Sequence, residues 1–386
     1  MPRELVIPAY KIRCAGNLDR DIWDTYVLNH PDASLFHRFG WREVIHGTYG
    51  HATYYLMLIA CNRGVDAAAR RAQRWRRSAE GILGVLPLVH LKHMIFGNSL
   101  VSLPFLDGGG ILADSSDVEE CLVSEAVTLA RSIGVDRIDL RCERAIAGCD
   151  GMSFAGNEGR LAPVRIAKRS SKVRMLLKLP GSSEALLKSF KAKLRSQIGR
   201  PLKEGCTSSI GGLELLEDFY RVFVINMRDL GSPVHSKDLM RHVLEVFSER
   251  SKIVVVYKSG APIASALVTG FNEILRNPWA SSDRKYAFMS PNMLLYSRML
   301  EFACDQGYRT FDFGRSSPGE GTFKFKEQWG AVAAPLHWYV LSTAGAAPEP
   351  DDSPAERYKL AARCWSKLPL AVTRLLGPRI RKHISL

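Results

Sequence analysis

Two segments from opposite halves of the chain share one sequence pattern, and this internal repeat is the feature that most limits the possible folds. Residues 129–140 read LARSIGVDRIDL, and residues 302–313 read FACDQGYRTFDF. The identical pairs are Ala130 with Ala303, Gly134 with Gly307, and Asp139 with Asp312. Upstream, GVLPLV at 84–89 falls opposite IASALV at 263–268 with nearly the same offset. Duplication of one structural unit is the simplest explanation. A chance match is the alternative, because strand, helix, glycine and strand often follow one another.

Each repeat reads as strands, a helix and a returning strand. Alternating or β-branched runs predict the strands, and apolar residues at helical spacing predict the helices. The expected strands include residues 51–60, 81–93, 252–260 and 261–271, and the expected helices cover 118–133 and 291–306. The second helix should begin with Ser290 as N-cap and Pro291 at its first position. The predicted fold class is α+β, with two units of mixed sheets flanked by helices.

The length of the chain, 386 residues, exceeds the usual size of a single domain. We predict an N-terminal domain over residues 1–165 and a C-terminal domain over residues 166–342. A stretch rich in Pro, Ala and Asp covers 342–356 and has the composition of a linker. Residues 343–386 are therefore interpreted as a linker followed by a basic tail.

The net charge of +14 is unevenly distributed. The cations gather in residues 63–77 (six Arg against one Asp), 165–203 (twelve Lys or Arg against one Glu) and 357–386 (eight against none). Clustered positive charge indicates an anionic partner such as a nucleotide-linked substrate, a nucleic acid or a membrane surface. On a helix predicted over 182–199, Lys188, Lys191 and Arg195 form a basic stripe suited to phosphate. The alternative is a solvated surface that only aids solubility.

The basic C-terminal segment has two interpretations. Residues 357–386 combine Trp365 and leucines with their cations, which fits an interfacial helix on an anionic membrane. Pro369 and Pro378 divide the segment into short pieces, and docking onto the protein body fits equally well. The sequence has no apolar run of about 18 residues for a spanning helix, no signal peptide at its start and only scattered cysteines. We expect a cytoplasmic protein, with peripheral contact at the inner membrane as one alternative.

The glycine-rich stretch at 311–331, FDFGRSSPGEGTFKFKEQWGA, is the first candidate for chemistry. Gly314 and Gly319 have the spacing of a nucleotide-binding P-loop. Glu320 and Gly321, however, occupy the positions where that motif needs Lys and Ser or Thr. A carboxylate at the lysine position would repel phosphate, so the P-loop interpretation is excluded.

Motifs for other cofactors and for metals are also missing. A coenzyme A grip of the acetyltransferase type needs a Gly-rich turn before a helix, and neither 114–122 nor 285–296 contains one. His90 and His93 lie in a predicted strand, where residues three apart face opposite sides. No Cys-x-x-Cys pair is present. We therefore expect no cofactor and no metal.

The stretch at 311–331 resembles the FemAB family of acyl- and aminoacyltransferases, together with SPNMLLYSRMLEFACDQGYRT before it and LRSQIGRPLKEG farther upstream. More narrowly, GILGVLPLVHLKHMIFGNSLVSLPFLDGGGILA resembles the FemAB-related branch associated with exosortase/PEP-CTERM gene systems. The likeness extends over about residues 20 to 342, and GTFKFKEQWGA is its most specific part. It implies two acetyltransferase (GNAT)-like units in tandem, in agreement with the repeat.

The resemblance also implies a functional lysine. In the better understood members, an amino acid moves from its tRNA ester to an amine on a peptidoglycan precursor. The family's Phe-Lys pair corresponds here to Phe325 and Lys326, followed by Trp329. A positioned cation lowers the barrier to the oxyanion by about 3–4 kcal/mol. Asp312 is a second catalytic candidate, as a group that takes the proton of the amine; a structural role is its alternative, because Asp139 repeats it.

Further cations are predicted to bind substrate. In an extended Phe-Lys-Phe-Lys run, Lys324 and Lys326 share one face, and Arg315 lies in the turn before them. Lysines over core phenylalanines are also typical of an ordinary sheet edge. Lys191 and Arg195 are the expected phosphate contacts on the helix between the repeats. The predicted substrate-binding residues are thus Arg315, Lys324, Arg195 and Lys191.

These observations predict an acyltransferase or aminoacyltransferase (EC 2.3) that forms an amide on a cell-envelope or exopolysaccharide precursor. The donor would be an aminoacyl-tRNA or an acyl thioester, and the acceptor an amine that bears phosphate. No DNA partner is predicted. One alternative is an N-acyltransferase that uses acyl-coenzyme A or acyl carrier protein. Another is a non-enzymatic protein that binds a glycan precursor or acts as a scaffold.

Overall fold

The computed structural model describes residues 9–61, 81–146, 164–169, 171–343 and 356–385. The chain divides into two compact units. The first contains Met1–Ser170, Pro335–Asp351 and His383–Leu386, and the second contains Ser171–Ala334 and Asp352–Lys382. The Arg-rich cluster at 63–77 lies outside the described residues.

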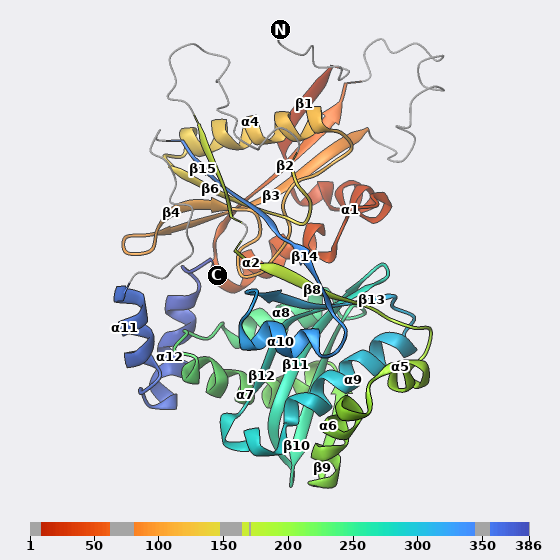
Figure 1. Ribbon diagram of the computed structural model, residues 1–386. Coiled ribbons are helices and arrows are strands. Elements are labelled where there is room, and N and C mark those ends of the chain that lie inside the picture. The colour runs from red at the N-terminus through yellow and green to blue at the C-terminus, as the bar shows by residue number, and fades with distance from the viewer. Residues whose placement is uncertain (1–8, 62–80, 147–163, 170, 344–355, 386) are drawn as a thin grey trace. The chain divides into compact units, whose positions relative to one another are not determined.

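The first unit is built on a mixed sheet (Figure 1). Its order is β1-β2-β3-β4-β6-β15-β7, with β5 paired to β3. The strands are β1 Tyr10–Cys14, β2 Ala52–Ala60, β3 Ile82–His93, β4 Gly97–Val101, β5 Leu112–Ala113, β6 Arg137–Cys142, β7 Arg165–Arg169 and β15 His337–Ser342. The helices are α1 Arg20–Asn29, α2 Gly40–Tyr49 and α4 Ser116–Ser132, with short 3-10 turns η1 Asn17–Asp19 and η2 Leu35–His37.

Helix α4 packs against this sheet over β2, β3, β5 and β6. The Ser115 side chain caps its start by accepting a hydrogen bond from Val118 N. Its buried face meets β3 at Gly84, where a Cβ would lie 2.6 Å from Cγ1 of Val118. Only glycine allows this close approach of helix and strand, so the small residue at 84 is a packing requirement.

The second unit is also a mixed sheet, with helices on both faces. Its order is β14-β8-β13-β12-β11-β10-β9. The strands are β8 Val173–Lys178, β9 Cys206–Gly211, β10 Ser251–Lys258, β11 Ala261–Phe271, β12 Ile274–Ser282, β13 Thr310–Ser316 and β14 Val332–Pro335. The helices are α5 Ser183–Ser189, α6 Ala192–Lys203, α7 Leu216–Asp229, α8 Lys237–Val246, α9 Pro291–Asp305, α10 Gly321–Glu327, α11 Glu356–Trp365 and α12 Leu370–Arg381, with η3 Leu213–Leu215 and η4 Arg284–Met289.

Strand β11 shows why both faces of this sheet are covered. Ala264, Ala266 and Val268 belong to the core cluster shared with α5, α6 and α9. Ser265 points to the opposite side, where its hydroxyl donates to Phe219 O of α7. A strand buried on both faces reads as a continuous apolar run, which is how APIASALVTGF reads in the sequence.

The internal repeat corresponds to the same arrangement in each unit. Strands β4 and β6 pair in parallel and the pairing ends at Asp139; β12 and β13 pair in parallel over the same length and end at Asp312. Gly134 and Gly307 each come just after a helix, and their φ angles, +67° and +78°, lie in the left-handed region. This backbone conformation ends the helix and returns the chain to the sheet. The predicted α+β fold of two mixed sheets flanked by helices is confirmed.

Three local expectations differ from the structure. Strand β15, which the domain prediction placed in the C-terminal domain, pairs with β6 and β7 in the sheet of the first unit. Helix α9 begins at Pro291 with Ser290 at the N-cap position, as predicted, but Ser290 has a left-handed φ of +56° and its side chain makes no capping hydrogen bond. The helix predicted over 182–199 is interrupted at Phe190, where the backbone is extended between α5 and α6.

The basic tail forms two short helices; Pro369 precedes the second of them as predicted, but Pro378, which was also expected to break the segment, lies inside α12. Helix α12 contacts α7, and it buries Thr373, Gly377 and Arg381 within the second unit. The Arg381 guanidinium donates through Nε to Nε2 of His235, at 3.1 Å. Docking onto the body therefore accounts for the inner face of α12. Over the part of the chain that the structure describes, no helix has the length and apolar character needed to cross a bilayer.

Candidate active site

The site lies where β13 of the second unit ends and α10 begins. Parallel pairing of β12 with β13 stops at Arg276 and Asp312, so the strands diverge beyond that point. The pairing of β13 with β8 is also irregular between Asp312 and Arg315. Gly314 lies in this irregular part with a φ of +74°. The chain then turns through residues 317–320 and enters α10.

Lys326 is a buried ammonium held by the end of this strand. Its side chain is on α10, and the residue is only 7% exposed. Nζ donates to Gly314 O at 3.1 Å and to Arg315 O at 2.8 Å. A buried lysine is rare unless its charge is compensated. Here the carbonyl dipoles of an irregular strand compensate part of it and fix the position of Nζ.

Asp312 is enclosed by hydrogen-bond donors. Its Oδ2 accepts from Nε and Nη2 of Arg174, at 3.1 and 2.8 Å, and from Nη1 of Arg276 at 3.3 Å. Its Oδ1 accepts from Gly314 N at 2.9 Å. The carboxylate therefore fixes the residue whose carbonyl holds Lys326. These contacts favour a positioning role for Asp312 over that of a proton acceptor.

The predicted extended Phe-Lys-Phe-Lys run is wrong, because these residues form α10. Two residues along a helix correspond to about 200° of rotation, so Lys324 and Lys326 point to different sides. Lys324 is accordingly exposed. Phe323 and Phe325 pack against the core cluster of the second unit. That packing, together with the hydrogen bond from Lys324 N to Glu320 O, stabilises the helix.

Of the predicted substrate-binding residues other than Lys324, only Arg315 lies next to Lys326. Arg315 is half-buried beside Lys326, which contacts its carbonyl. Lys191 and Arg195 are exposed at the start of α6, and Arg195 Nη1 donates to Phe190 O. Lys188 lies on the separate helix α5 and pairs with Glu184 at 2.6 Å. The continuous basic stripe is therefore wrong, because the helix break at Phe190 divides it.

Sequence reasoning missed a group of buried polar atoms near α10. Asn277 Nδ2 donates to the hydroxyl of Tyr296 at 3.3 Å, and the rings of Tyr296 and Trp329 are 6.3 Å apart. Burial raises the pKa of Tyr296 to about 12, against an opposing effect of the Asn277 hydrogen bond. Asn277 Oδ1, Ser316 Oγ and Trp329 Nε1 are buried with no hydrogen-bond partner among the described residues. The polar Asn277 within the largely buried strand β12 was the available signal.

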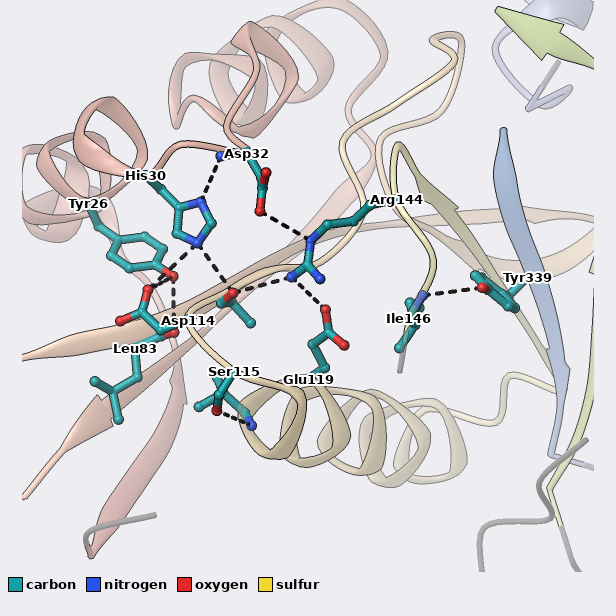
Figure 2. A network of polar contacts seen from close by, with 12 residues as sticks. Tyr26, His30, Asp32, Leu83, Asp114, Ser115, Glu119, Arg144, Ile146 and Tyr339 are labelled. Atoms are coloured by element: carbon teal, nitrogen blue, oxygen red, sulfur yellow. Dashed lines mark hydrogen bonds and ion pairs between the residues drawn. The ribbon is translucent and has the colours of Figure 1, made fainter. Parts of the chain in front are cut away.

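In the first unit, a network of polar side chains lies at the start of α4 (Figure 2). At the start of α4, Arg144 Nη2 contacts Glu119 Oε1 at 2.6 Å and Ala113 O at 3.2 Å. His30 Nε2 lies 3.2 Å from Ala113 O and 3.6 Å from Asp114 Oδ1. Tyr26 donates its hydroxyl to Asp114 Oδ1 at 3.0 Å. Figure 2 shows these groups pointing toward one another.

Burial dominates the electrostatics of this network. It raises the pKa of Tyr26 and of Asp114, and it lowers the pKa of His30. The carboxylates of Asp114 and Glu119 lie at the start of α4, where a bound phosphate would need open N–H groups. Among the described residues, buried polar atoms without a hydrogen-bond partner occur in both units, so the buried Lys326 is what distinguishes the second unit.

Comparisons with known proteins agree on the architecture. A family model described as "Acetyltransferase (GNAT) domain" matches residues 188–327, which include α6 through α10 and Lys326. The crystal structure of FemX superposes with a TM-score of 0.57 at 14% identity, covering 86% of this chain and 96% of that one. This chain has a tandem GNAT-like fold.

Two further solved structures show the same fold. A tandem GNAT protein from the clavulanic acid biosynthesis pathway has a TM-score of 0.50 at 10% identity, covering 88% of this chain and 100% of that one. The C-terminal domain (DUF2156) of a putative lysylphosphatidylglycerol synthetase from Agrobacterium fabrum has a TM-score of 0.50 at 12% identity, covering 84% and 91%. No curated protein matches the chain in sequence.

Proposed function

We propose that this chain is an acyltransferase or aminoacyltransferase that forms an amide at the end of β13 in its second unit. The observation that carries the proposal is the buried ammonium of Lys326, fixed by the carbonyls of Gly314 and Arg315. The GNAT family match over residues 188–327 supports a transfer reaction in this unit. The likeness to FemX supports the same fold-level assignment.

In the proposed reaction, a neutral amine of the acceptor attacks the carbonyl carbon of an ester or thioester. A carbon–nitrogen bond forms and the carbonyl oxygen becomes an oxyanion, which the ammonium of Lys326 stabilises. Collapse of this intermediate breaks the carbon–oxygen or carbon–sulfur bond. The proton lost by the amine leaves with the departing oxygen or sulfur. Asp312 takes no proton in this scheme, since it holds Gly314 in place.

Substrate binding in this proposal uses groups around Lys326. The unpartnered Oδ1 of Asn277 and Nε1 of Trp329 would pair with polar groups of the acceptor or donor, because unsatisfied buried atoms are costly. Arg315 and Lys324 would contact phosphate near the mouth of the site, and Lys191 and Arg195 farther along α6. The acceptor we propose is a phosphate-bearing amine of a cell-envelope or exopolysaccharide precursor, as in a PEP-CTERM system.

Two donors remain in the proposal, an aminoacyl-tRNA and an acyl thioester. The match to an acetyltransferase domain favours the thioester, as coenzyme A or as acyl carrier protein. A cytoplasmic location follows from either donor. Residues 357–386 retain exposed Leu360, Leu375 and Leu376 on their outer surface, so a peripheral membrane contact through the tail is part of the proposal.

Lys326→Met tests the assignment in the purified full chain, with Lys178→Met as a matched control on the exposed end of β8. Acyl thioesters and aminoacyl-tRNAs are offered with amine acceptors, and the amide product is measured by mass spectrometry. We expect Lys326→Met to lower the turnover by about a hundredfold to a thousandfold. Full turnover by Lys326→Met would refute the mechanism. Loss of amide formation on ribonuclease treatment would identify the tRNA donor.

A further inference from the structure

The hairpin between β3 and β4 ends in three exposed apolar residues. Met94 is fully exposed, Ile95 is 79% exposed and Phe96 is 36% exposed. The last cross-strand pair before them joins His93 to Gly97. Turns normally carry Gly, Asn, Asp or Ser, so three large apolar side chains at a turn need a physical reason. We name residues 94–96 the hairpin tip.

The structure holds this tip in a defined conformation. Gly97 has a φ of +96°, which closes a short hairpin loop at its C-terminal side. Ile95 N donates to Nδ1 of His93 at 3.1 Å. The Phe96 ring lies 5.0 Å from the ring of His93 and stacks on that of His383. The base of the tip is therefore packed, while Met94 and Ile95 project beyond it.

Among the described residues, Met94 and Ile95 do not belong to the core cluster of the first unit, so packing of that core does not explain apolar residues at the tip. Contiguous exposed apolar surface marks an interaction site. A stable protein interface buries about 800 Å² on each partner. Two exposed side chains and the exposed third of Phe96 cover much less than that, and they project from a narrow, convex ribbon. A bilayer accepts such a wedge without a matching groove.

The charges around the tip indicate the kind of bilayer. The hairpin, residues 82–101, contains no acidic residue, and Lys92 and His93 directly precede the tip. His90 lies on the same strand, and His383 packs on His93 with ring centroids 4.3 Å apart. The exposed side chain of Lys92, beside an inserted apolar segment, extends toward the headgroups, and anionic lipids attract its charge.

We propose that the hairpin tip, residues 94–96, inserts into the interfacial layer of an anionic lipid bilayer. This contact would hold the first unit at a membrane surface, separately from any contact made by the tail. It does not depend on the proposed transfer reaction. Lipid is the proposed partner of the hairpin tip. The experiment below distinguishes it from a second copy of the chain.

The test is flotation of the full chain with vesicles of phosphatidylcholine and phosphatidylglycerol in equal parts. The double substitution Met94→Ser with Ile95→Ser should lower the vesicle partition coefficient by at least about tenfold. Leu18→Ser is the matched control, because Leu18 is also fully exposed in the first unit. It should leave binding unchanged. Replacement of the exposed tail residues Leu360, Leu375 and Leu376 by Ser separates the contribution of the tail and leaves His383 in place.

Three results would overturn the proposal. The first is absence of vesicle binding by the unsubstituted protein, and the second is unchanged binding by the double variant. The third is that the unsubstituted protein forms a dimer and binds no vesicles, whereas the double variant is a monomer. That result would show that the tip binds a second copy of the chain. A direct readout is Ile95→Trp, whose emission should shift to the blue with these vesicles. No shift would also contradict insertion.

Discussion

Asp312 and Asp139 occupy the same position of the repeat, and the structure predicts very different effects for their replacement by Asn. Asp312 shares its carboxylate between Arg174 and Arg276, and all three side chains are less than 10% exposed. Removing one partner of a buried ion pair costs about 3–5 kcal/mol. Asp139 pairs with Arg137 at 2.7 Å, but the Arg137 side chain is 43% exposed. Such surface pairs contribute about 0–1 kcal/mol.

We therefore expect Asp312→Asn to destabilise the second unit by about 3–5 kcal/mol and Asp139→Asn to destabilise the first by less than about 1 kcal/mol. Hydrogen exchange on peptides from β13 and β6 measures each unit separately, which matters because a chain of two units need not unfold in one step. Similar losses for the two variants, or a loss below about 1 kcal/mol for Asp312→Asn, would refute the claim that the buried carboxylate holds this strand end.

Two further predictions concern the docking of α12 in the second unit. Burial lowers the pKa of His235 well below its usual value of 6.5, with a smaller effect of Arg381. As the pH falls below about 6.5, the imidazole therefore takes up a proton in the unfolded chain before it does so in the folded chain. The free energy of unfolding should then decrease by up to about 1.4 kcal/mol for each pH unit. Urea unfolding at several pH values measures this slope, which His235→Gln should reduce; an equal slope in the variant would contradict it. A Cβ on Gly377 would lie 2.8 Å from Val234 Cγ1, so Gly377→Ala should loosen α12 and speed its cleavage by trypsin; unchanged cleavage would show that the helix adjusts.

The repeat was readable from the sequence because its signals are local. Gly134 and Gly307 end helices through their own backbone conformation, and the strand patterns beside them have a period of two. For strand β15, no local sequence pattern indicates which of the two sheets it joins. Its partners β6 and β7 lie far away in the sequence, and only the assembled sheet decides which edge a returning strand joins.

At the candidate site, the sequence pointed to Lys326 but not to the residues that surround it. Four residues of Phe-Lys-Phe-Lys fit a strand or a helical turn equally well. The contacts of Phe323 and Phe325 with the core decide for the helix. That outcome separates Lys324 from Lys326, whose burial no spacing rule would have predicted. The arginine partner of Asp312 on β8 is likewise a long-range contact, from position 174.

The two units show how a duplicated fold can divide its tasks. In the second, Asp312 fixes Gly314, and the carbonyl of Gly314 holds the ammonium of Lys326 near buried atoms without partners. In the first, Arg144 pairs with Glu119 at the start of α4, so cation and anion satisfy each other. A cation fixed by carbonyl groups can respond to a developing anion, and this arrangement is the basis of the transfer site proposed at Lys326 in the second unit.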